Sequence, residues 1–473
     1  MGPKKTDVIV IGEGITGLGI AYWLKKRGID VVVLAKDHQV GGTMKSVHDQ
    51  GFLYETGANT ALETTPLFKE LVSDLKLEAE FTYANPAGKN RYILRDGVLH
   101  SMPLGPGALL STKLFSAAAK FRLLKEPFIG HGEKEESIAE FVERRLGREF
   151  LDYAIDPFVA GVFAGKPEQL SVRSSFPKLY ALEEKYGGLV KGMIKGAGER
   201  KQRAERAKDR AETFSFLNGM QVLPQAIGDS LGTSMTLDAK VTGIRNLTTM
   251  HNEPANEPDA RRYLVEYLHH SRDEEMEADF VVLAIPAFDA APIIKSLSRE
   301  TAHVLSSIYY SPIISIFLGV KREDIGHRLD GFGCLIPSKE RRQILGCLWN
   351  SCLFGKRAPA GMVALNAFIG GARQPELTEM NDERVIQTTR DELKSIMQLS
   401  GKPVYLNLTR WQKSIPQYEI GYQKKMDAFA QFEEFQPGIV LAGNYRGGIS
   451  VGDCVKNANE AAEYLAAQIE AMH

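Results

Sequence analysis

The feature that most constrains the fold is a glycine-rich turn between two short apolar segments near the N-terminus. Residues 7–11 (Asp-Val-Ile-Val-Ile) have the unbroken apolar character of a strand that is buried on both faces. The turn, residues 12–17 (Gly-Glu-Gly-Ile-Thr-Gly), follows at once. A helix is predicted over 18–27 and a second buried strand over 31–34. This order predicts a β-α-β unit that carries the G-x-G-x-x-G fingerprint of dinucleotide binding.

Each glycine of the turn has a separate physical role. Gly12 permits the tight turn, Gly14 lets the backbone approach a pyrophosphate, and Gly17 lets helix and strand pack closely. The N-terminus of the predicted helix, which follows Ile15 and Thr16 of the turn, offers unpaired N–H groups and a positive dipole end to phosphate oxygens. Ile15 and Thr16 are therefore also expected to contact the cofactor. Because the fingerprint lies between two predicted strands, it predicts a dinucleotide site.

Two later groups of residues favour FAD over NAD. The first follows the second strand and comprises Gly41, Gly42, Lys45, Gly57, Ala58 and Asn59. The second is a predicted strand, turn and helix start near the C-terminus, with Gly443, Asn444, Val451, Gly452 and Asp453. Asp453 would cap a helix that runs to about residue 471. A site built from both chain ends is the layout of a flavoprotein with two dinucleotide-binding folds; the alternative is an ordinary strand–helix pair with a capping aspartate.

The rest of the chain divides into a helical region and a region with several strands. Residues 96–212 look mainly helical and basic, and end in a charged helix around 201–212. Strands are predicted at 237–241, 262–268, 279–285, 313–320 and 362–368, a surface turn at 252–259 and a helix at 382–398. The predicted class is α/β (α+β overall). It has an FAD-binding domain from 1–86, 222–290 and 434–473, a mixed-sheet substrate domain from 87–93, 213–221 and 291–433, and a helical domain at 94–212.

Charge and cysteine content argue against several classes of function. The chain has 58 Lys and Arg against 59 Asp and Glu, a net charge of −1, which gives no support to nucleic-acid binding. The four cysteines form no C-x-x-C pair and have no histidines at zinc spacing, so free thiols and no metal site are expected. The start has no apolar signal segment, and the uncharged run 301–320 is interpreted as a helix end followed by a buried strand, not a transmembrane span. A cytoplasmic location is expected.

Motifs spread over nearly the whole chain resemble the oxygen-dependent porphyrinogen oxidases. Besides the fingerprint they are Gly41-Gly42, 155–165, 278–284, 331–333, 415–418 and 443–454. The cofactor segments are shared with amine oxidases and phytoene desaturases, whereas 158–165 and 444–454 are more specific. The resemblance implies non-covalent FAD, a porphyrinogen substrate and O₂. Six electrons would be removed in three flavin cycles, each of which reduces O₂ to H₂O₂.

The resemblance also implies substrate-binding residues, for which the residues alone leave alternatives. Arg91 matches a propionate anchor, because its planar guanidinium holds a carboxylate at two points; the alternative is a surface arginine in a hairpin. Phe332 matches a ring-stacking position, or is a core Phe in a turn. Gly161 matches a glycine whose carbonyl faces the macrocycle, or ends a helix. Leu318 would be an apolar wall of the site, or is plain core, and Phe163 is also assigned to the substrate site.

Further cofactor contacts implied by the resemblance are Lys36, Val241, Ala284 and Trp411. No catalytic carboxylate pair or histidine stands out, so the C-terminal helix end is expected to stabilise the reduced flavin. The chain departs from the family pattern at Ala35, where an acidic residue usually accepts hydrogen bonds from the adenosine ribose. Either Asp37 substitutes for that acid or the contact is lost. A second departure is Gly421-Tyr422, where a Gly-His pair is common.

The expected substrate is protoporphyrinogen IX, in tetrapyrrole and heme biosynthesis. Three alternatives stay open: oxidation of coproporphyrinogen III by the same fold, an amine oxidase or carotenoid desaturase, and a non-enzymatic, prenyl-binding escort protein. The segment in which Leu110, Leu114, Phe121 and Leu124 are flanked by Lys113, Lys120 and Lys125 suits an anionic membrane surface. The alternative is an ordinary helix with a solvated rim. A homodimer also stays open.

Overall fold

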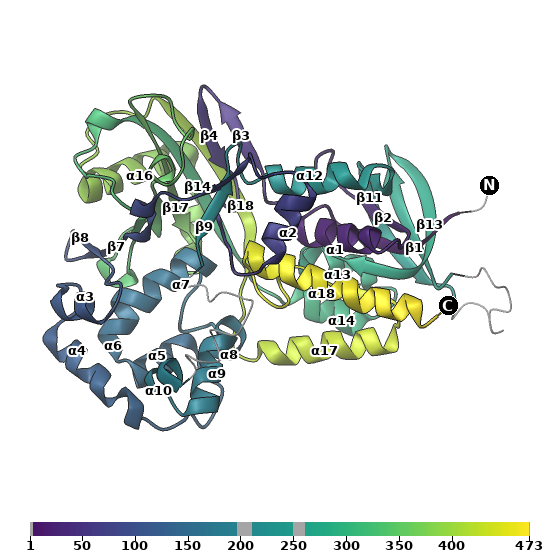
Figure 1. Ribbon diagram of the computed structural model, residues 1–473, viewed down its shortest axis with the longest axis horizontal. Helices are drawn as coiled ribbons and strands as arrows, with labels where there is room; N and C mark the ends of the chain where they lie inside the picture. Colours follow the sequence, from purple (N-terminus) through teal and green to yellow (C-terminus); the bar gives the residue numbers. More distant parts are fainter. Residues whose placement is uncertain (1–2, 196–210, 249–260, 473) are drawn as a thin grey trace.

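The computed structural model describes residues 3–195, 211–248 and 261–472. Figure 1 shows two large sheets side by side, with a group of short helices beneath the second sheet. This is the mixed α/β fold that the sequence predicts. The predicted surface turn at 252–259 and most of the charged helix at 201–212 lie outside the described residues.

The first sheet has seven strands, in the order β10-β2-β1-β13-β12-β11, with β19 also paired to β13. Their bounds are β1 (Lys4–Ile11), β2 (Val31–Leu34), β10 (Met235–Thr236), β11 (Ala239–Asn246), β12 (Tyr263–His269), β13 (Arg272–Leu283) and β19 (Ile439–Leu441). Strand β1 runs parallel to β2 and β13, and β13 runs parallel to β19. The carboxyl ends of these four strands therefore meet at one edge, where dinucleotides bind in open α/β sheets.

Alternate residues of the strands feed two separate cores, which gives the sheet a helical layer on each face. Val8 and Val10 pack with α1 (Ile15–Lys26), α2 (Leu67–Asp74), α12 (Val222–Leu231) and α18 (Val451–Glu470). Ile9 and Ile11 pack on the other face with α13 (Ala287–Ile294), α14 (Arg299–Ser306) and α17 (Tyr422–Phe435). Helices α1 and α18, from opposite ends of the chain, lie side by side in Figure 1 and are in contact.

The second sheet also has seven strands, in the order β18-β14-β17-β16-β15-β7-β8. Their bounds are β7 (Arg91–Arg95), β8 (Val98–Ser101), β14 (Tyr310–Lys321), β15 (Gly333–Leu335), β16 (Gly346–Leu348), β17 (Met362–Gly370) and β18 (Tyr405–Pro416). Helix α16 (Asp382–Met397) covers one face. The uncharged run 301–320 is the end of α14 followed by β14, as predicted, and no helix within the described ranges is long and apolar enough to cross a bilayer.

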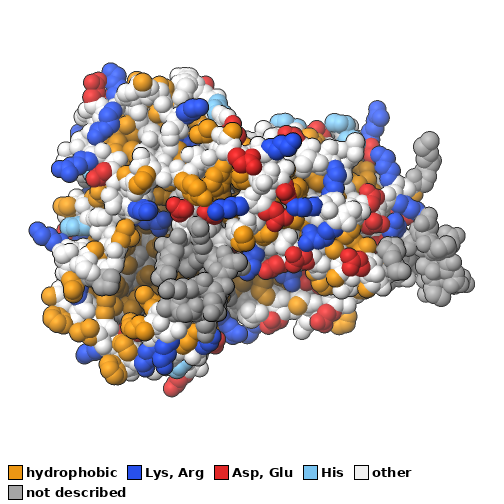
Figure 2. Space-filling view, in the orientation of Figure 1, with side chains coloured by type: hydrophobic (Ala, Val, Ile, Leu, Met, Phe, Trp, Pro, Cys, Tyr) orange, Lys and Arg blue, Asp and Glu red, His pale blue; other side chains and the backbone are white. Residues whose placement is uncertain are grey.

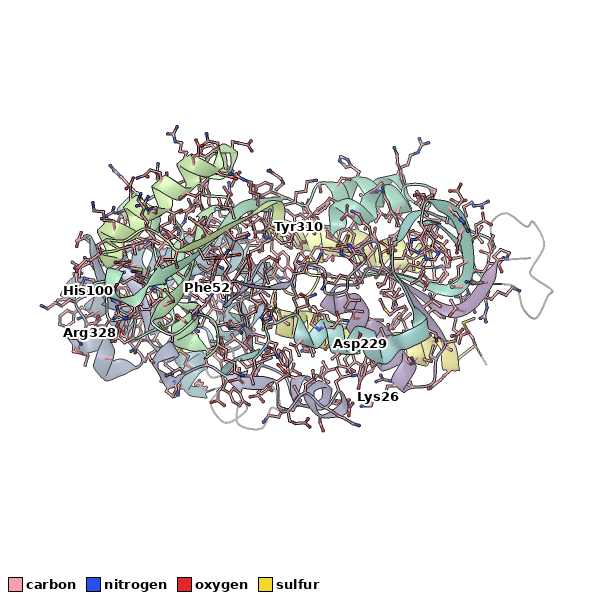
Figure 3. The ribbon with its side chains drawn as sticks, turned by 90° about the horizontal axis from the view of Figure 1, so that it is seen from above. Lys26, Phe52, His100, Asp229, Tyr310 and Arg328 are labelled. Atoms are coloured by element: carbon pink, nitrogen blue, oxygen red, sulfur yellow. The ribbon has the colours of Figure 1, made fainter. Side chains whose placement is uncertain are left out.

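Short elements join the two halves of the molecule. They are β3 (Ser46–Asp49) paired with β4 (Phe52–Glu55), the sheet of β5 (Ala61–Leu62), β9 (Thr213–Phe216) and β6 (Phe81–Tyr83), and α15 (Asn350–Leu353). Figure 3 places Phe52 among the strands of the second sheet and Tyr310 at the junction of the two halves. The Phe52 ring stacks on Tyr405 at 5.4 Å, and the Tyr310 hydroxyl accepts a hydrogen bond from the Ala287 N–H at 3.0 Å.

The helical region consists of short helices rather than long ones. They are α3 (Pro106–Ser111), α4 (Ala117–Arg122), α5 (Ile138–Arg145), α6 (Arg148–Phe150), α7 (Asp156–Phe163), α8 (Val172–Ser175), α9 (Pro177–Tyr186) and α10 (Leu189–Lys195). The continuous apolar stripe predicted from Leu110 to Leu124 is wrong, because the chain breaks between α3 and α4. Local side-chain bonds compete with the helix there: the Ser116 hydroxyl accepts from the Ala119 N–H and caps α4. Leu114 consequently faces inward and is completely buried.

Candidate functional site

The turn between β1 and α1 has the backbone geometry that its glycines predict. Gly12 has φ +117°, and a Cβ there would lie 2.6 Å from the Ala284 carbonyl oxygen. A Cβ at Gly17 would overlap the Gly12 carbonyl oxygen, so α1 approaches the turn too closely for any side chain. By contrast, a Cβ at Gly14 would meet nothing within 4 Å. Two glycines therefore close the turn, and the third leaves open space above the N-terminus of α1, as a pyrophosphate site requires.

The segments at 41–45 and 57–59 converge on this turn, as predicted. Gly41 forms a parallel bridge with Gly14, and its N–H donates to the Glu13 carbonyl at 2.9 Å. Gly57 packs so closely on the Thr43 carbonyl that a side chain would clash. Lys45 forms an ion pair with Asp37 at 3.2 Å.

The C-terminal segment reaches the same edge of the sheet. Strand β19 pairs with β13, and Gly443 and Asn444 follow it directly. The cap of α18 is Ser450, not Asp453 as predicted: the Ser450 hydroxyl accepts from the Asp453 N–H at 3.1 Å, and the Asp453 carboxylate accepts the Ser450 N–H in return. The prediction placed the cap three residues too late, because in a capping box the acidic residue is the third residue of the helix and not the cap itself. The helix still begins at Val451, as predicted.

The remaining predicted cofactor residues differ in how they are exposed. The Trp411 indole donates to the Thr56 carbonyl at 2.8 Å, which places its ring against the segment leading to Ala58 and Asn59. Lys36 is exposed at the end of β2. The Val241 side chain is buried in the core of the first sheet, so only its backbone is available to a ligand.

The second sheet brings together Arg91 and Phe332, which lie more than two hundred residues apart in the chain. Strand β7 runs parallel to β15, with Arg91 opposite Gly333, and the Phe332 N–H donates to the Asn90 carbonyl at 2.8 Å. The Arg91 guanidinium lies 5.2 Å from the centre of the Phe332 ring. Desolvation lowers the pKa of Arg91, although the residue stays accessible to solvent. Neither an ion pair nor a side-chain hydrogen bond joins Arg91 to the described residues, so it presents an uncompensated cation beside an aromatic plane.

Gly161 lies inside α7 and does not end it. The residue that ends α7 in the left-handed conformation is Ala164, with φ +48°. A Cβ at Gly161 would lie 2.6 Å from a methyl group of Leu335 on β15. A larger residue here would have to displace the Leu335 side chain, and Leu335 is an apolar neighbour of the site that the sequence did not reveal.

Two of the predicted substrate residues face the wrong way. Leu318 is completely buried against α16 with Ile314, Ile316 and Val320, because alternate residues of β14 share one face of the sheet. Phe163 is buried in the core of the helical region, against Phe176. The prediction that Leu318 and Phe163 contact the substrate is therefore wrong.

A buried polar cluster near Asn59 was also not predicted from the sequence. The Asn59 side-chain oxygen accepts hydrogen bonds from Asn366 at 3.2 Å and Asn350 at 3.4 Å, and the Ser315 hydroxyl donates to Asn366 at 3.0 Å. Nearby, burial raises the pKa of Glu55 to about 7, while bonds from Ser46 and Met220 and the charge of Arg357 act to lower it. Isolated Asn and Ser residues in strands give no signal in a sequence, so only the register of β14 and β17 reveals this cluster.

These features fit a dinucleotide cofactor. The open space at Gly14 and the two glycine contacts beside it match a pyrophosphate cradle, and the first turns of α1 and α18 supply N–H donors. No group of three or more potential metal ligands occurs among residues 3–195, 211–248 and 261–472.

Comparisons with known proteins agree with this geometry. The family model of flavin-containing amine oxidoreductases matches residues 15–466. The chain is 32% identical to protoporphyrinogen oxidase 2 of Arabidopsis thaliana, over 98% of this chain and 94% of the relative. It is 27% identical to coproporphyrinogen III oxidase of Bacillus subtilis, over 98% of each. The crystal structure of a candidate protoporphyrinogen oxidase from Exiguobacterium sp. 255-15 has a TM-score of 0.78 at 21% identity, covering 99% of this chain and 100% of that one.

The predicted family and fold are therefore confirmed, and with them a flavin as the cofactor. The match spans the fingerprint helix and the C-terminal helix alike, which are the two ends that build the cofactor edge. The chain belongs to the flavin-containing amine oxidoreductases, and its relatives in that family include the protoporphyrinogen oxidases.

Proposed function

We propose that this enzyme uses FAD and O₂ to oxidise protoporphyrinogen IX to protoporphyrin IX. The observation that carries the proposal is the Arg91–Phe332 pair, a desolvated cation against an aromatic plane at the edge of the second sheet. A porphyrinogen offers propionates for the cation and a macrocycle for the ring. The names of the curated relatives support the same substrate class.

The residues of the chain bind and orient, and none is required to act as an acid or base. A flavin held at the edge formed by the first turns of α1 and α18 would supply the hydride acceptor and the route for electrons to O₂, with H₂O₂ as the product. Arg91 holds a propionate, Phe332 and Leu335 border the macrocycle, and Gly161 lets α7 approach it. The N–H groups of the first turn of α18, capped by Ser450, stabilise negative charge that develops nearby.

Arg91 also argues against the other chemistries. An amine substrate is a cation, which the guanidinium would repel, and an apolar carotenoid or prenyl chain would leave it buried without a partner.

Coproporphyrinogen III stays the second candidate, because a curated relative bears that activity in its name. The test is H₂O₂ release and porphyrin fluorescence with protoporphyrinogen IX and coproporphyrinogen III side by side. Faster turnover of coproporphyrinogen III would reverse the choice between the two substrates, and no turnover of either would refute the proposal.

FAD is expected to be held without a covalent bond. Cys454 follows the start of α18, but its side chain is buried in the core on one face of the first sheet. Acid precipitation of the purified protein should therefore leave all flavin in the supernatant, as measured by its absorbance. Mass spectrometry of the pellet checks the result: a mass increase equal to FAD would contradict it.

We further propose that the helical region docks on an anionic membrane. Five apolar side chains are largely exposed there, forming an apolar patch defined by Leu104, Leu110, Phe121, Leu124 and Phe128. Figure 2 shows hydrophobic side chains gathered over α3 and α4 at the lower left. Lys113 and Lys125 are exposed within the same segments, whereas Lys120 binds the carbonyls of Leu110 and Thr112. The surface differs from the predicted stripe by excluding Leu114 and Lys120.

The double variant Lys113→Gln/Lys125→Gln should bind anionic vesicles roughly thirtyfold more weakly, since each lysine near the surface contributes about 1 kcal/mol. Vesicle sedimentation measures the change, with flavin absorbance as the check on folding. Lys394→Gln/Lys402→Gln, which removes two exposed lysines from the second-sheet half, is the matched control and should bind as the wild type does. An equal loss of vesicle binding in both double variants would mean that only the net charge of the protein matters, and would contradict docking through the helical region.

A further inference from the structure

The turn between β1 and α1 contains one side chain that plays no part in closing the turn. Glu13 stands between Gly12 and Gly14 and is only 9% exposed. Its backbone carbonyl accepts the Gly41 N–H, but no lysine or arginine in the described part of the chain forms an ion pair with its carboxylate. Charged carboxylates are rarely buried without a partner, because burial removes their hydration. The position of Glu13 therefore needs an explanation other than packing.

The Glu13 carboxylate lies at the carboxyl end of β2. The Gly12 N–H donates to the Leu34 carbonyl at 3.0 Å, which holds the turn against this end of the strand. The N–H of Lys36, just beyond the end of β2, is near enough to the Glu13 carboxylate to act on its pKa. In dinucleotide-binding folds this end of the second strand is where an acidic residue accepts the hydroxyl groups of the adenosine ribose.

Of the residues that would ordinarily supply that acid, one has no carboxylate and the other is already paired with a lysine. Ala35 is completely buried and has no polar side chain. Asp37 is engaged by Lys45 at 3.2 Å, and its backbone carbonyl accepts the Asp238 N–H at 3.3 Å. The sequence leaves two possibilities open, substitution by Asp37 and loss of the ribose contact. The structure adds a third, because the turn brings the Glu13 carboxylate to the end of β2.

We infer that Glu13 is the acceptor for the ribose hydroxyl groups of the adenosine half of FAD, in place of an acid at the end of β2. The inference rests on the proposed function, in which FAD is the cofactor. Burial raises the pKa of Glu13, while hydrogen bonds from the Glu13 and Lys36 N–H groups act to lower it. A carboxylate has about four acceptor sites, so two hydroxyl donors would add to these N–H bonds, and bonds to a charged acceptor are stronger than neutral ones.

The test compares two ligands on two proteins. Flavin-free protein is titrated with FAD and with an analogue whose adenosine ribose lacks both hydroxyl groups, and flavin fluorescence measures each Kd. The wild type should bind the analogue roughly ten- to a hundredfold more weakly than FAD. Glu13→Gln should lose about the same factor for FAD, and its two Kd values should become nearly equal. Activity is not needed for either measurement.

Asp37→Asn is the matched control, since it removes the neighbouring carboxylate and should keep the full penalty for the analogue. If Asp37→Asn loses the penalty and Glu13→Gln keeps it, the role belongs to Asp37. If the wild type itself binds both ligands equally, the inference fails whether or not Glu13→Gln folds. A wild type that binds neither ligand would instead refute FAD as the cofactor, so the two failures are distinguishable.

Discussion

Replacing Arg91 by alanine should lower kcat/KM for protoporphyrinogen IX about ten- to two-hundredfold. The guanidinium lies over Phe332, has no carboxylate partner in the described part of the chain, and has a pKa lowered by desolvation. A propionate would supply the missing counter-charge, and a charge-assisted hydrogen bond of this kind contributes about 1.5–3 kcal/mol. The expected fall in kcat/KM of Arg91→Ala is this free energy converted to a rate factor, at about 1.4 kcal/mol for each factor of ten.

Most of the loss should appear in KM. The propionate stays charged throughout the reaction, so Arg91 binds ground state and transition state alike, which is the pattern of uniform binding. Arg91→Lys should recover only part of the affinity, because lysine supplies the charge without the planar guanidinium. Steady-state kinetics on protein of equal flavin content gives both values.

Arg328→Ala is the control for a general effect of charge. Arg328 is exposed at the same end of the molecule, where Figure 3 labels it, and its replacement should leave both constants unchanged. A wild-type KM in Arg91→Ala would mean that another cation holds the propionate. A loss confined to kcat would mean that Arg91 acts on the reacting atoms and is more than a propionate anchor.

Local signals in the sequence were sufficient for the cofactor edge. The fingerprint, the two strands around it and the start of α18 at Val451 depend on interactions within a few residues, and all three are confirmed. The pairing of Arg91 with Phe332 depends on a parallel register between β7 and β15, which lie far apart in the chain, and nothing local specifies it. Only the family resemblance placed these two residues in one site.

The errors at Leu318 and Leu114 have physical causes of different kinds. In a strand, a shift of one residue moves a side chain to the opposite face of the sheet. A residue matched to a family position without knowledge of the strand register can therefore face α16 instead of the substrate, as Leu318 does. For Leu114, apolar spacing predicts one helix, but the hydroxyl groups of Thr112 and Ser116 bind backbone N–H groups and interrupt it. Glu13 gives no signal in the sequence, because the fingerprint leaves the residue between its first two glycines unspecified.

Replacing Arg145 by methionine should destabilise the helical region by about 3–5 kcal/mol. Arg145 and Glu126 are both completely buried and are joined at 3.0 Å. Arg145 also binds Glu183 at 2.7 Å, and Glu126 accepts N–H bonds from Leu189 at 2.7 Å and Val190 at 3.0 Å. One guanidinium thus connects the segment after α4 with α5, α9 and the start of α10, and its removal leaves two carboxylates buried without their main partner.

Amide hydrogen exchange in α5 and α9 measures this effect locally. Opening should become roughly a hundred- to several-thousandfold more frequent in Arg145→Met, while the amides of β1 and α1 keep their protection. Arg148→Met is the matched control, because Arg148 is largely exposed and Asp152, its partner, retains Lys339 at 3.1 Å. Because the Arg148 guanidinium is largely exposed and Asp152 keeps a cation, the loss of this pair should cost at most about 1 kcal/mol. Equal exchange in the two variants would contradict the assignment.

The difference between Arg145→Met and the wild type should shrink as pH falls. Burial alone would raise the pKa of Glu183, but hydrogen bonds from Arg145 and Arg144 and their charges lower it below its ordinary value. A carboxyl group with a lowered pKa stabilises the fold above its unfolded pKa, and this contribution is lost as pH falls through the folded pKa. In the variant one of the two arginines that lower the pKa of Glu183 is gone, so the unpaired charge on Glu183 is relieved when that carboxyl group is protonated. Exchange measured at neutral pH and in mild acid, near the ordinary pKa of a glutamate, should therefore show a large difference between the proteins at neutral pH and a small one in acid. A difference in exchange rate that stays constant over this pH range would mean that unpaired carboxylates do not cause the destabilisation.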